Sequence, residues 1–427
     1  MENANKYSFK ITNILFFFFP VALILGNFFT NLNIVFLIIF SLIFYYDKFF
    51  KLKINYLDKI ILFFFFFTFV TLILNIFENY INAEITSKII IIKTLYYLRY
   101  LALYFTFRML VEQKILRLDL FCLICFLCAF FVCFDIYFQS FFGKNLFGMV
   151  PGTDTGRHNP GVFDTELIAG GYLQKFALFS FFLPFLFLQN KKIKILIHFV
   201  FFIFFTFGIL LSGNKMPLYL FITSYFIFLL LNYRSWKHLF STFVVIFIIL
   251  SLLYKTNEAY KYNFHTFYDH GKLAIHSFFV DDYNDIPEEN WSRSYVLEVQ
   301  CFKYIWKRNP FFGGGLRSYR TVDGGGCNTH PHNYYFEILT DLGLIGLVII
   351  LFFLLKLFSQ FFVLKNKWIK LKPNILDNRT FPFFLIFIIE FFPLRSSGSF
   401  FSTNNASIIF LVLAILVSLV SKKNLNP

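Results

Sequence analysis

Apolar segments long enough to cross a bilayer recur from one end of the sequence to the other. A transmembrane helix needs about 20 mainly apolar residues, because the hydrocarbon core holds no water to satisfy backbone N–H and C=O groups. The chain is 58% hydrophobic and 15% charged, whereas soluble domains carry about 25% charged residues. The sequence therefore predicts an all-α integral membrane protein with about twelve transmembrane helices. The predicted spans are 11–29, 32–46, 58–77, 88–109, 118–142, 167–189, 192–211, 216–232, 238–254, 334–362, 380–394 and 405–421.

Basic residues predict the orientation of these spans. The net charge of +15 could indicate nucleic-acid binding, but Lys and Arg gather in the short connections on one side of the predicted bundle. Such connections face the cytoplasm, so we expect both chain ends there and no nucleic-acid partner. The first apolar run lacks a small-residue cleavage site and is interpreted as a retained span. The basic residues of this side are Lys48, Lys51, Lys53, Lys114, Arg117, Lys191, Lys192, Lys194, Arg234, Lys237, Lys365, Lys367, Lys370, Lys372, Lys422 and Lys423.

Two longer polar regions lie on the opposite, predicted outer side. One is the loop 143–166, and the other is the stretch 254–333, which is large enough for a subdomain. We therefore divide the chain into spans 1–9 over residues 1–253, an outer subdomain over 254–333, and spans 10–12 over 334–427. Within the subdomain, Ser292–Lys307 predicts a helix that Asn309-Pro310 ends.

The six cysteines fall into two groups. Four lie inside one apolar segment at a spacing that resembles a metal site, although small buried side chains are the simpler interpretation. Cys301 and Cys327 lie on the outer side, where an oxidising compartment could join them in a disulfide. The intramembrane cysteines are Cys122, Cys125, Cys128 and Cys133.

Three polar residues stand immediately before the apolar segment 334–362: His330, His332 and Asn333. A histidine at the mouth of a membrane helix can exchange protons near neutral pH and can reach a substrate whose tail lies in the lipid. Asn333 could cap the following helix or contact a substrate. His330 and His332 could form a metal pair, but no third ligand stands at an obvious spacing.

His332-Asn333, nine further residues and then Gly343-x-x-Gly346 resemble the signature of the O-antigen ligase family, which also includes O-antigen polymerases. The segments 157–176, 309–320 and 393–401 are also similar to parts of that family. Its members place a large periplasmic loop between spans nine and ten of twelve, and the histidine ends that loop. The likeness extends from about Phe134 onward.

The resemblance implies a glycosyltransferase of the inner membrane that moves a polysaccharide from undecaprenyl pyrophosphate to a hydroxyl of lipid A core at the periplasmic face. His332 would assist the acceptor hydroxyl. Arg293 and Lys215 would bind the pyrophosphate, on which negative charge accumulates during transfer. Family members usually carry an arginine where Lys215 stands, and lysine cannot bind phosphate oxygens through a planar fork.

Outer-side arginines depart from the usual charge bias and are candidates for anion binding. We assign Arg157, Arg317 and Arg395 to substrate binding, together with Asn333 and His330.

The resemblance implies inversion at the anomeric carbon and no cofactor or metal, because the pyrophosphate linkage supplies the energy. The expected partners are the lipid-linked glycan, the lipid A core acceptor and membrane lipids, and homo-oligomerisation stays open. An O-antigen polymerase would perform the same chemistry on a different acceptor. A twelve-span transporter is the alternative from another class, although transporters tend to show paired halves and midplane charges.

Overall fold

A computed structural model gives the arrangement of the chain. It describes all residues except 1, 80–83, 152–157, 165, most of 233–293, 322–329, 366–367, 372–379, 396–397 and 425–427.

Helices make up almost all of the regular structure. The longer ones are α1 (Glu2–Leu25), α2 (Asn27–Phe50), α3 (Tyr56–Asn79), α4 (Glu84–Glu112), α5 (Leu118–Phe142), α8 (Lys191–Leu211), α9 (Lys215–Asn232), α12 (Ser294–Arg308), α14 (Tyr334–Phe361) and α16 (Thr403–Asn424). The shorter ones are η1 (Gly161–Phe163), α6 (Ala169–Phe176), η2 (Ala177–Phe181), α7 (Leu183–Phe187), α13 (Ser318–Thr321) and α15 (Phe381–Glu390). Strands β1 (Phe362–Lys365) and β2 (Trp368–Leu371) form one antiparallel hairpin.

The prediction of a helical, multi-span membrane protein is confirmed, with the small hairpin as an addition. Within the described part of the chain, 8 helical segments are long and apolar enough to cross a membrane. Two shorter apolar helices, Lys215–Leu231 and Phe381–Glu390, accompany them. Helix α4 has the length of a span, but four basic residues interrupt its apolar sequence. The predicted span 238–254 lies mostly outside the described residues.

Four predicted spans differ from the helices observed. The first two, 11–29 and 32–46, are displaced because the chain breaks at Gly26, between α1 and α2. The segment 167–189 is divided among α6, η2 and α7. The segment 380–394 contains only the 10 residues of α15, which at about 1.5 Å per residue cannot cross a bilayer.

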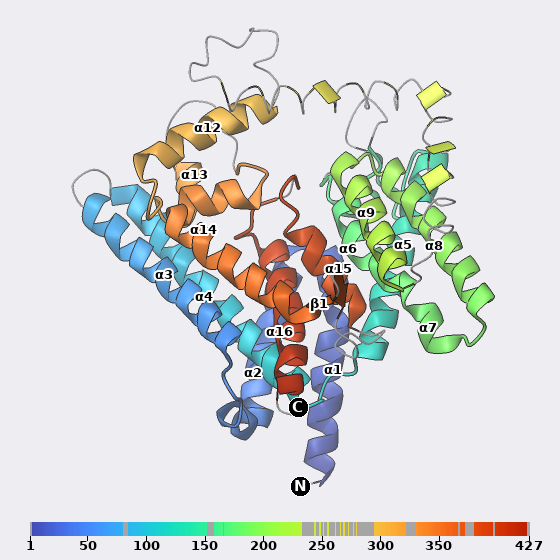
Figure 1. Ribbon diagram of the computed structural model, residues 1–427, viewed down its shortest axis with the longest axis horizontal. Helices are drawn as coiled ribbons and strands as arrows, with labels where there is room; N and C mark the ends of the chain where they lie inside the picture. Colours follow the sequence, from blue (N-terminus) through green and yellow to red (C-terminus); the bar gives the residue numbers. More distant parts are fainter. Residues whose placement is uncertain are drawn as a thin grey trace.

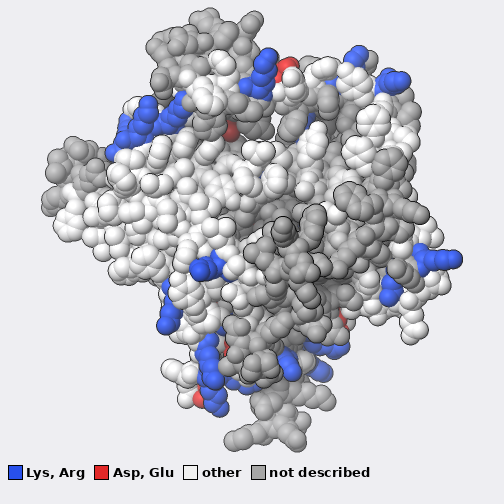
Figure 2. Space-filling model, in the orientation of Figure 1, with Lys and Arg blue, Asp and Glu red and all other residues white. Residues whose placement is uncertain are grey.

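The start of α1 and the end of α16 lie at one end of the helix bundle, and α12 and α13 lie at the other (Figure 1). Figure 2 shows Lys and Arg gathered mainly toward these two ends, with a mostly uncharged belt between them. Such a belt suits contact with lipid. The large apolar core beneath it joins α1, α3, α4, α5, α9, α14 and α16.

Helix α14 is kinked at Gly343, and the segment 309–315 fills the kink. The backbone N–H groups of Leu344 and Ile345 donate to Pro310 O at 2.9 Å and to Phe311 O at 3.2 Å instead of to their own helix. In return, Gly314 N–H donates to Thr340 O and Gly315 N–H to Asp341 O, both at 2.9 Å. The outer segment thus replaces part of the hydrogen-bond ladder of α14.

The two glycines of the Gly-x-x-Gly signature are explained by this kink. Gly343 has a φ of +66°, and a side chain there would overlap the carbonyl oxygen of Phe311. A Cβ on Gly346 would overlap the side chain of Leu342. Both positions are therefore restricted to glycine by space.

We expect Gly343→Ala to lower the free energy of unfolding by about 2 kcal/mol, because the new Cβ adds left-handed strain and displaces the segment 309–315. Gly171→Ala, on α6, is the matched control: a Cβ there has no heavy atom within 4 Å, and alanine favours a helix over glycine by about 0.5–1 kcal/mol. Melting of the detergent-solubilised protein checks both. Equal melting temperatures for the two variants would contradict the proposed packing.

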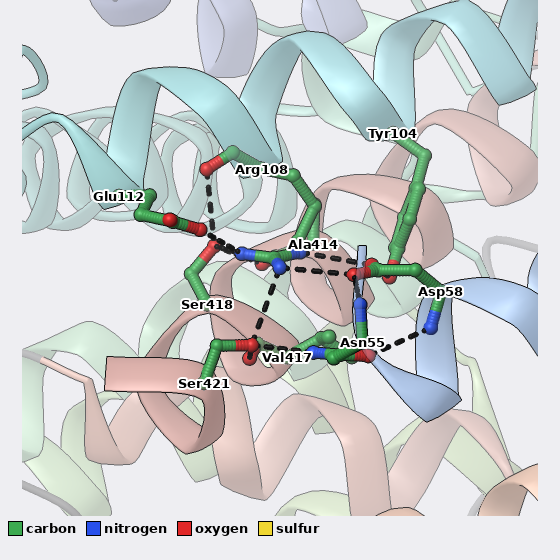
Figure 3. A network of polar contacts seen from close by, with 9 residues as sticks. All are labelled: Asn55, Asp58, Tyr104, Arg108, Glu112, Ala414, Val417, Ser418 and Ser421. Atoms are coloured by element: carbon green, nitrogen blue, oxygen red, sulfur yellow. Dashed lines mark hydrogen bonds and ion pairs between the residues drawn. The ribbon is translucent and has the colours of Figure 1, made fainter. Parts of the chain in front are cut away.

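A buried polar cluster, here called the Arg108 network, joins α3, α4 and α16 (Figure 3). Arg108 Nε and Nη2 donate to the two carboxylate oxygens of Asp58 at 2.9 and 3.0 Å. Arg108 Nη1 and Nη2 also reach Glu112, Ser418 and Ser421 at 3.0, 3.1 and 3.2 Å. Tyr104 and Asn55 complete the network through Asp58.

Candidate functional site

A pocket of about 740 Å³ opens among α6, α13, α16 and the segments that precede α9 and α14. We call it the histidine pocket, because His330 and His332 stand on its wall. Its apolar side includes Leu23, Tyr172, Phe176, Met216 and Ile408. Its polar side consists of Gln174, Lys175, Asn214, Lys215, Arg320, His330, His332, Arg395, Ser399, Ser402, Asn404 and Asn405.

The charges on this wall have one sign. Lys175, Lys215, Arg320 and Arg395 line the pocket, and no Asp or Glu is among its described lining residues. Positive charges that gather on low-dielectric walls attract and hold anions. The pocket is therefore suited to an anionic group carried by a partly apolar molecule.

Two of these cations share one buried carboxylate in what we call the Glu390 cluster: Lys175, Tyr334, Glu390 and Arg395. Lys175 Nζ lies 3.2 Å from Glu390 Oε1, and Arg395 forms an ion pair with Glu390 Oε2. Tyr334 OH donates to Glu390 at 3.0 Å, and its ring lies 5.2 Å from the Arg395 guanidinium. One anion between two cations leaves a net positive charge at the pocket wall.

His332 stands at the mouth of α14 with a φ of +43°, a conformation that residues other than glycine rarely adopt. Its Nε2 lies 3.6 Å from Oε1 of Glu298, a buried residue of α12. The rings of His330 and His332 lie 4.2 Å apart between centroids. A base beside a carboxylate that orients it is the usual arrangement for activating a hydroxyl.

His330 is held in its neutral form. Burial, His332 and the Arg320 guanidinium together lower the pKa of its imidazole to about 4, whereas a histidine in an unfolded chain has a pKa of about 6.5. Between these values the unfolded state binds a proton that the folded state does not, so stability rises with pH.

We therefore expect acidification from about pH 7 to about pH 5 to lower the melting temperature. His330→Gln should weaken that dependence, because glutamine does not titrate. Melting curves of the purified protein across this range check it. A variant whose melting temperature falls as steeply as that of the unmodified protein would contradict the expectation.

Asn333 caps α14, which is one of the two roles that the sequence left open for it. Its Oδ1 accepts the N–H groups of Tyr335 and Phe336 at 2.9 and 3.4 Å. Its Nδ2 donates to Pro393 O at 2.9 Å and to Arg395 O at 3.5 Å. The residue therefore joins the start of α14 to the segment that carries Arg395.

Glu337, one turn further along α14, holds another part of the wall. Its two oxygens accept the Ser399 hydroxyl and the Phe400 N–H, both at 2.5 Å. These two hydrogen bonds hold Ser399, a residue of the pocket wall, in place.

The structure brings together four residues that the sequence proposed for the site: Lys215, His330, His332 and Arg395. Arg317 is exposed and does not line the pocket. Its backbone N–H donates to Asp341 Oδ2 at 2.8 Å, and Arg320, one turn later, lines the pocket instead.

Three other residues that the sequence analysis singled out lie outside the described part of the chain. Arg157 and Arg293 lie outside the described residues. Cys301 is disulfide-bonded, and Cys327, the partner suggested by the sequence, lies outside the described residues. The four intramembrane cysteines are free thiols and are largely buried.

Sequence reasoning missed Lys175, Glu390 and Glu298. The first two are ionisable residues inside predicted apolar spans, and such residues mark functional sites in membrane proteins. Their sequence positions could therefore have revealed them. Glu298 lies on an amphipathic helix among other charged residues, and no local pattern distinguishes it.

Residues 199–351 match the family model described as O-antigen ligase. The matched segment contains Lys215, Arg320, both histidines and the kink of α14, whereas Lys175 and Arg395 lie outside it. No curated protein matches the chain. The match confirms the resemblance carried by the His-Asn and Gly-x-x-Gly residues. Over residues 199–351 the chain is thus similar to the O-antigen ligase family.

Proposed function

We propose that this protein transfers a polysaccharide from undecaprenyl pyrophosphate to a sugar hydroxyl of lipid A core. The reaction would take place at the periplasmic face of the inner membrane, with both chain termini in the cytoplasm. The observation that carries the proposal is the histidine pocket, which combines four cations, two imidazoles and an apolar wall and has no acidic side chain among its described lining residues. Its lining suits the three parts of such a donor: pyrophosphate, glycan and lipid.

The cations would stabilise the leaving group. When the bond between the anomeric carbon and the pyrophosphate oxygen breaks, the electron pair stays on the pyrophosphate. Fixed positive charges beside that oxygen lower the barrier without reorganising at the moment of reaction. Lys175, Lys215, Arg320 and Arg395 are the described residues available for this, and Arg293 remains a further proposed ligand.

His332 would assist the acceptor. As the acceptor oxygen attacks the anomeric carbon from the face opposite the pyrophosphate, its proton passes to the imidazole, and the configuration inverts. Glu298 stabilises the resulting imidazolium through its position 3.6 Å from Nε2. The energy comes from the pyrophosphate linkage, so the proposal includes no metal and no nucleotide.

A deletion strain tests the proposal. Its lipopolysaccharide ladder and its polyprenyl-linked glycans are analysed together. We expect lipid A core that carries no polysaccharide, together with long polysaccharide that accumulates on the lipid carrier. Core that carries a single repeat unit would assign the protein as a polymerase, and an unchanged ladder would contradict a role in lipopolysaccharide assembly.

A further inference from the structure

The histidine pocket also contains a wall of uncharged amide side chains: Gln174, Asn214, Asn404 and Asn405. Two of them are used inside the protein. Asn214 accepts from Gly170 N–H at 2.9 Å and donates to Leu167 O at 3.0 Å. Asn405 accepts from Lys175 at 3.2 Å and donates to Ser399 O at 3.0 Å. These two amides hold the wall in place.

The other two, Gln174 and Asn404, have buried polar atoms that no described residue satisfies. Gln174 is 1% exposed, and its Nε2 has no hydrogen-bond partner among the described residues. On the neighbouring helix α16, Asn404 Oδ1 likewise has no partner in the described part of the chain. A buried polar atom without a partner is costly, so its retention calls for a ligand or a water molecule.

A second glutamine of equal burial shows the contrast. Gln139, on α5, is also 1% exposed. Its Nε2 donates to Met149 O at 3.3 Å, and its Oε1 accepts from Gly161 N–H at 2.8 Å. The protein therefore satisfies a buried glutamine elsewhere but leaves the pocket one with an unused donor.

The two unused atoms require opposite partners. Gln174 Nε2 is a donor and needs an acceptor, whereas Asn404 Oδ1 is an acceptor and needs a donor. Pyrophosphate oxygens only accept at neutral pH, and a lipid tail does neither. A sugar, through its hydroxyl or acetamido groups, supplies both.

There is also room for a sugar beside Gln174. Gly171 precedes it by three residues on α6, so the two lie on the same face of the helix. Gly171 lines the pocket, and a Cβ built on it has no heavy atom within 4 Å. Lys175, the next residue in the chain, belongs to the Glu390 cluster, so the open space adjoins the cationic wall.

We infer that Gln174 and Asn404 form a subsite for the sugar unit attached to the pyrophosphate. The inference rests on the proposed function and extends it, because it separates recognition of the glycan from recognition of the carrier. The ligand class is a neutral, hydroxyl-bearing sugar residue.

The test uses Gln174→Met, which keeps the shape of the side chain and removes its amide. Gln139→Met is the matched control, and Asn404→Ala is a second variant on a different helix. Two probes are bound to the full-length protein in detergent: bare undecaprenyl pyrophosphate, and the same carrier bearing one N-acetylhexosamine. Melting temperatures are measured for every variant.

Gln174→Met should leave the melting temperature unchanged or raised, because an unsatisfied amide is removed. It should weaken binding of the sugar-bearing carrier about tenfold and leave binding of the bare carrier unchanged. Gln139→Met should melt at a lower temperature, because it leaves buried groups unpaired. Asn404→Ala should repeat the selective loss if Gln174→Met does not fold.

Three results would overturn the subsite. A melting temperature of Gln174→Met that falls as far as that of Gln139→Met would make Gln174 structural. An equal loss for both carriers would assign it to the anion site. Unmodified protein that binds the bare carrier as tightly as the sugar-bearing one would exclude a sugar subsite while the proposed function stands. If the unmodified protein binds neither carrier, the proposed function itself fails.

Discussion

His332→Asn is expected to lower glycan transfer by at least about 100-fold, the lower range for loss of a general acid or base. Asparagine tolerates the left-handed backbone conformation that His332 adopts, so the segment before α14 keeps its course. The new side chain retains polarity but cannot take up the acceptor proton. The measurement is transfer by purified protein from a lipid-linked glycan to lipid A core, at equal protein concentration.

Glu298→Gln provides the companion measurement. It removes the carboxylate that lies 3.6 Å from the imidazole and leaves the histidine in place. Transfer should fall by a smaller factor than in His332→Asn, and binding of the carrier should change little in either variant. Transfer by His332→Asn at more than about a third of the normal rate would exclude the histidine from the proton transfer that the proposal gives it.

Arg108→Met is expected to have the largest effect on stability, with a loss of about 3–5 kcal/mol. The side chains of Arg108 and Asp58 are fully buried, and the guanidinium hydrogen bonds reach α3, α16 and Glu112 on its own helix. Removing the cation leaves Asp58 as an uncompensated buried charge and takes the ion-pair partner from Glu112, whose side chain is partly buried. The variant should therefore yield little folded protein after extraction in detergent.

Two further variants locate the origin of this loss. Asp58→Asn combined with Arg108→Met should recover part of the stability, because the pair is removed together. Arg117→Met alters an exposed arginine before α5 and should change the free energy of unfolding by less than about 0.5 kcal/mol. If Arg108→Met melts within a few degrees of the unmodified protein, the Arg108 network contributes little to the fold.

The membrane-spanning character of the chain could be predicted from the sequence. The free energy gained by transferring long apolar segments into lipid outweighs the conformational preferences of individual residues. The kink of α14 could not be predicted. It depends on hydrogen bonds between Leu344 and Pro310 and between Ile345 and Phe311, and no local pattern links these residues. Local hydropathy shows only that α14 is long and apolar.

The candidate site was predictable where polar residues stand at the mouth of a span, as with His332 and Lys215. It was not predictable where a side chain depends on a partner from a distant helix. Glu390 makes a close pair with Lys175, more than two hundred residues earlier, and only the packed bundle brings α6 and α15 together. Arg317 and Arg320 are equally plausible in sequence, and the turn of α13 decides which one reaches the pocket.

The connection 316–333 is held at both ends by α14, and this affects how the protein can evolve. Before the residues 316–333, Gly314 and Gly315 are bonded to α14, and after them Asn333 caps the same helix. Because both ends are held by one helix, residues can be inserted or lost between Arg320 and His330 without moving His332. Related enzymes could therefore acquire new acceptors through this connection while the imidazole and the cationic wall stay in register.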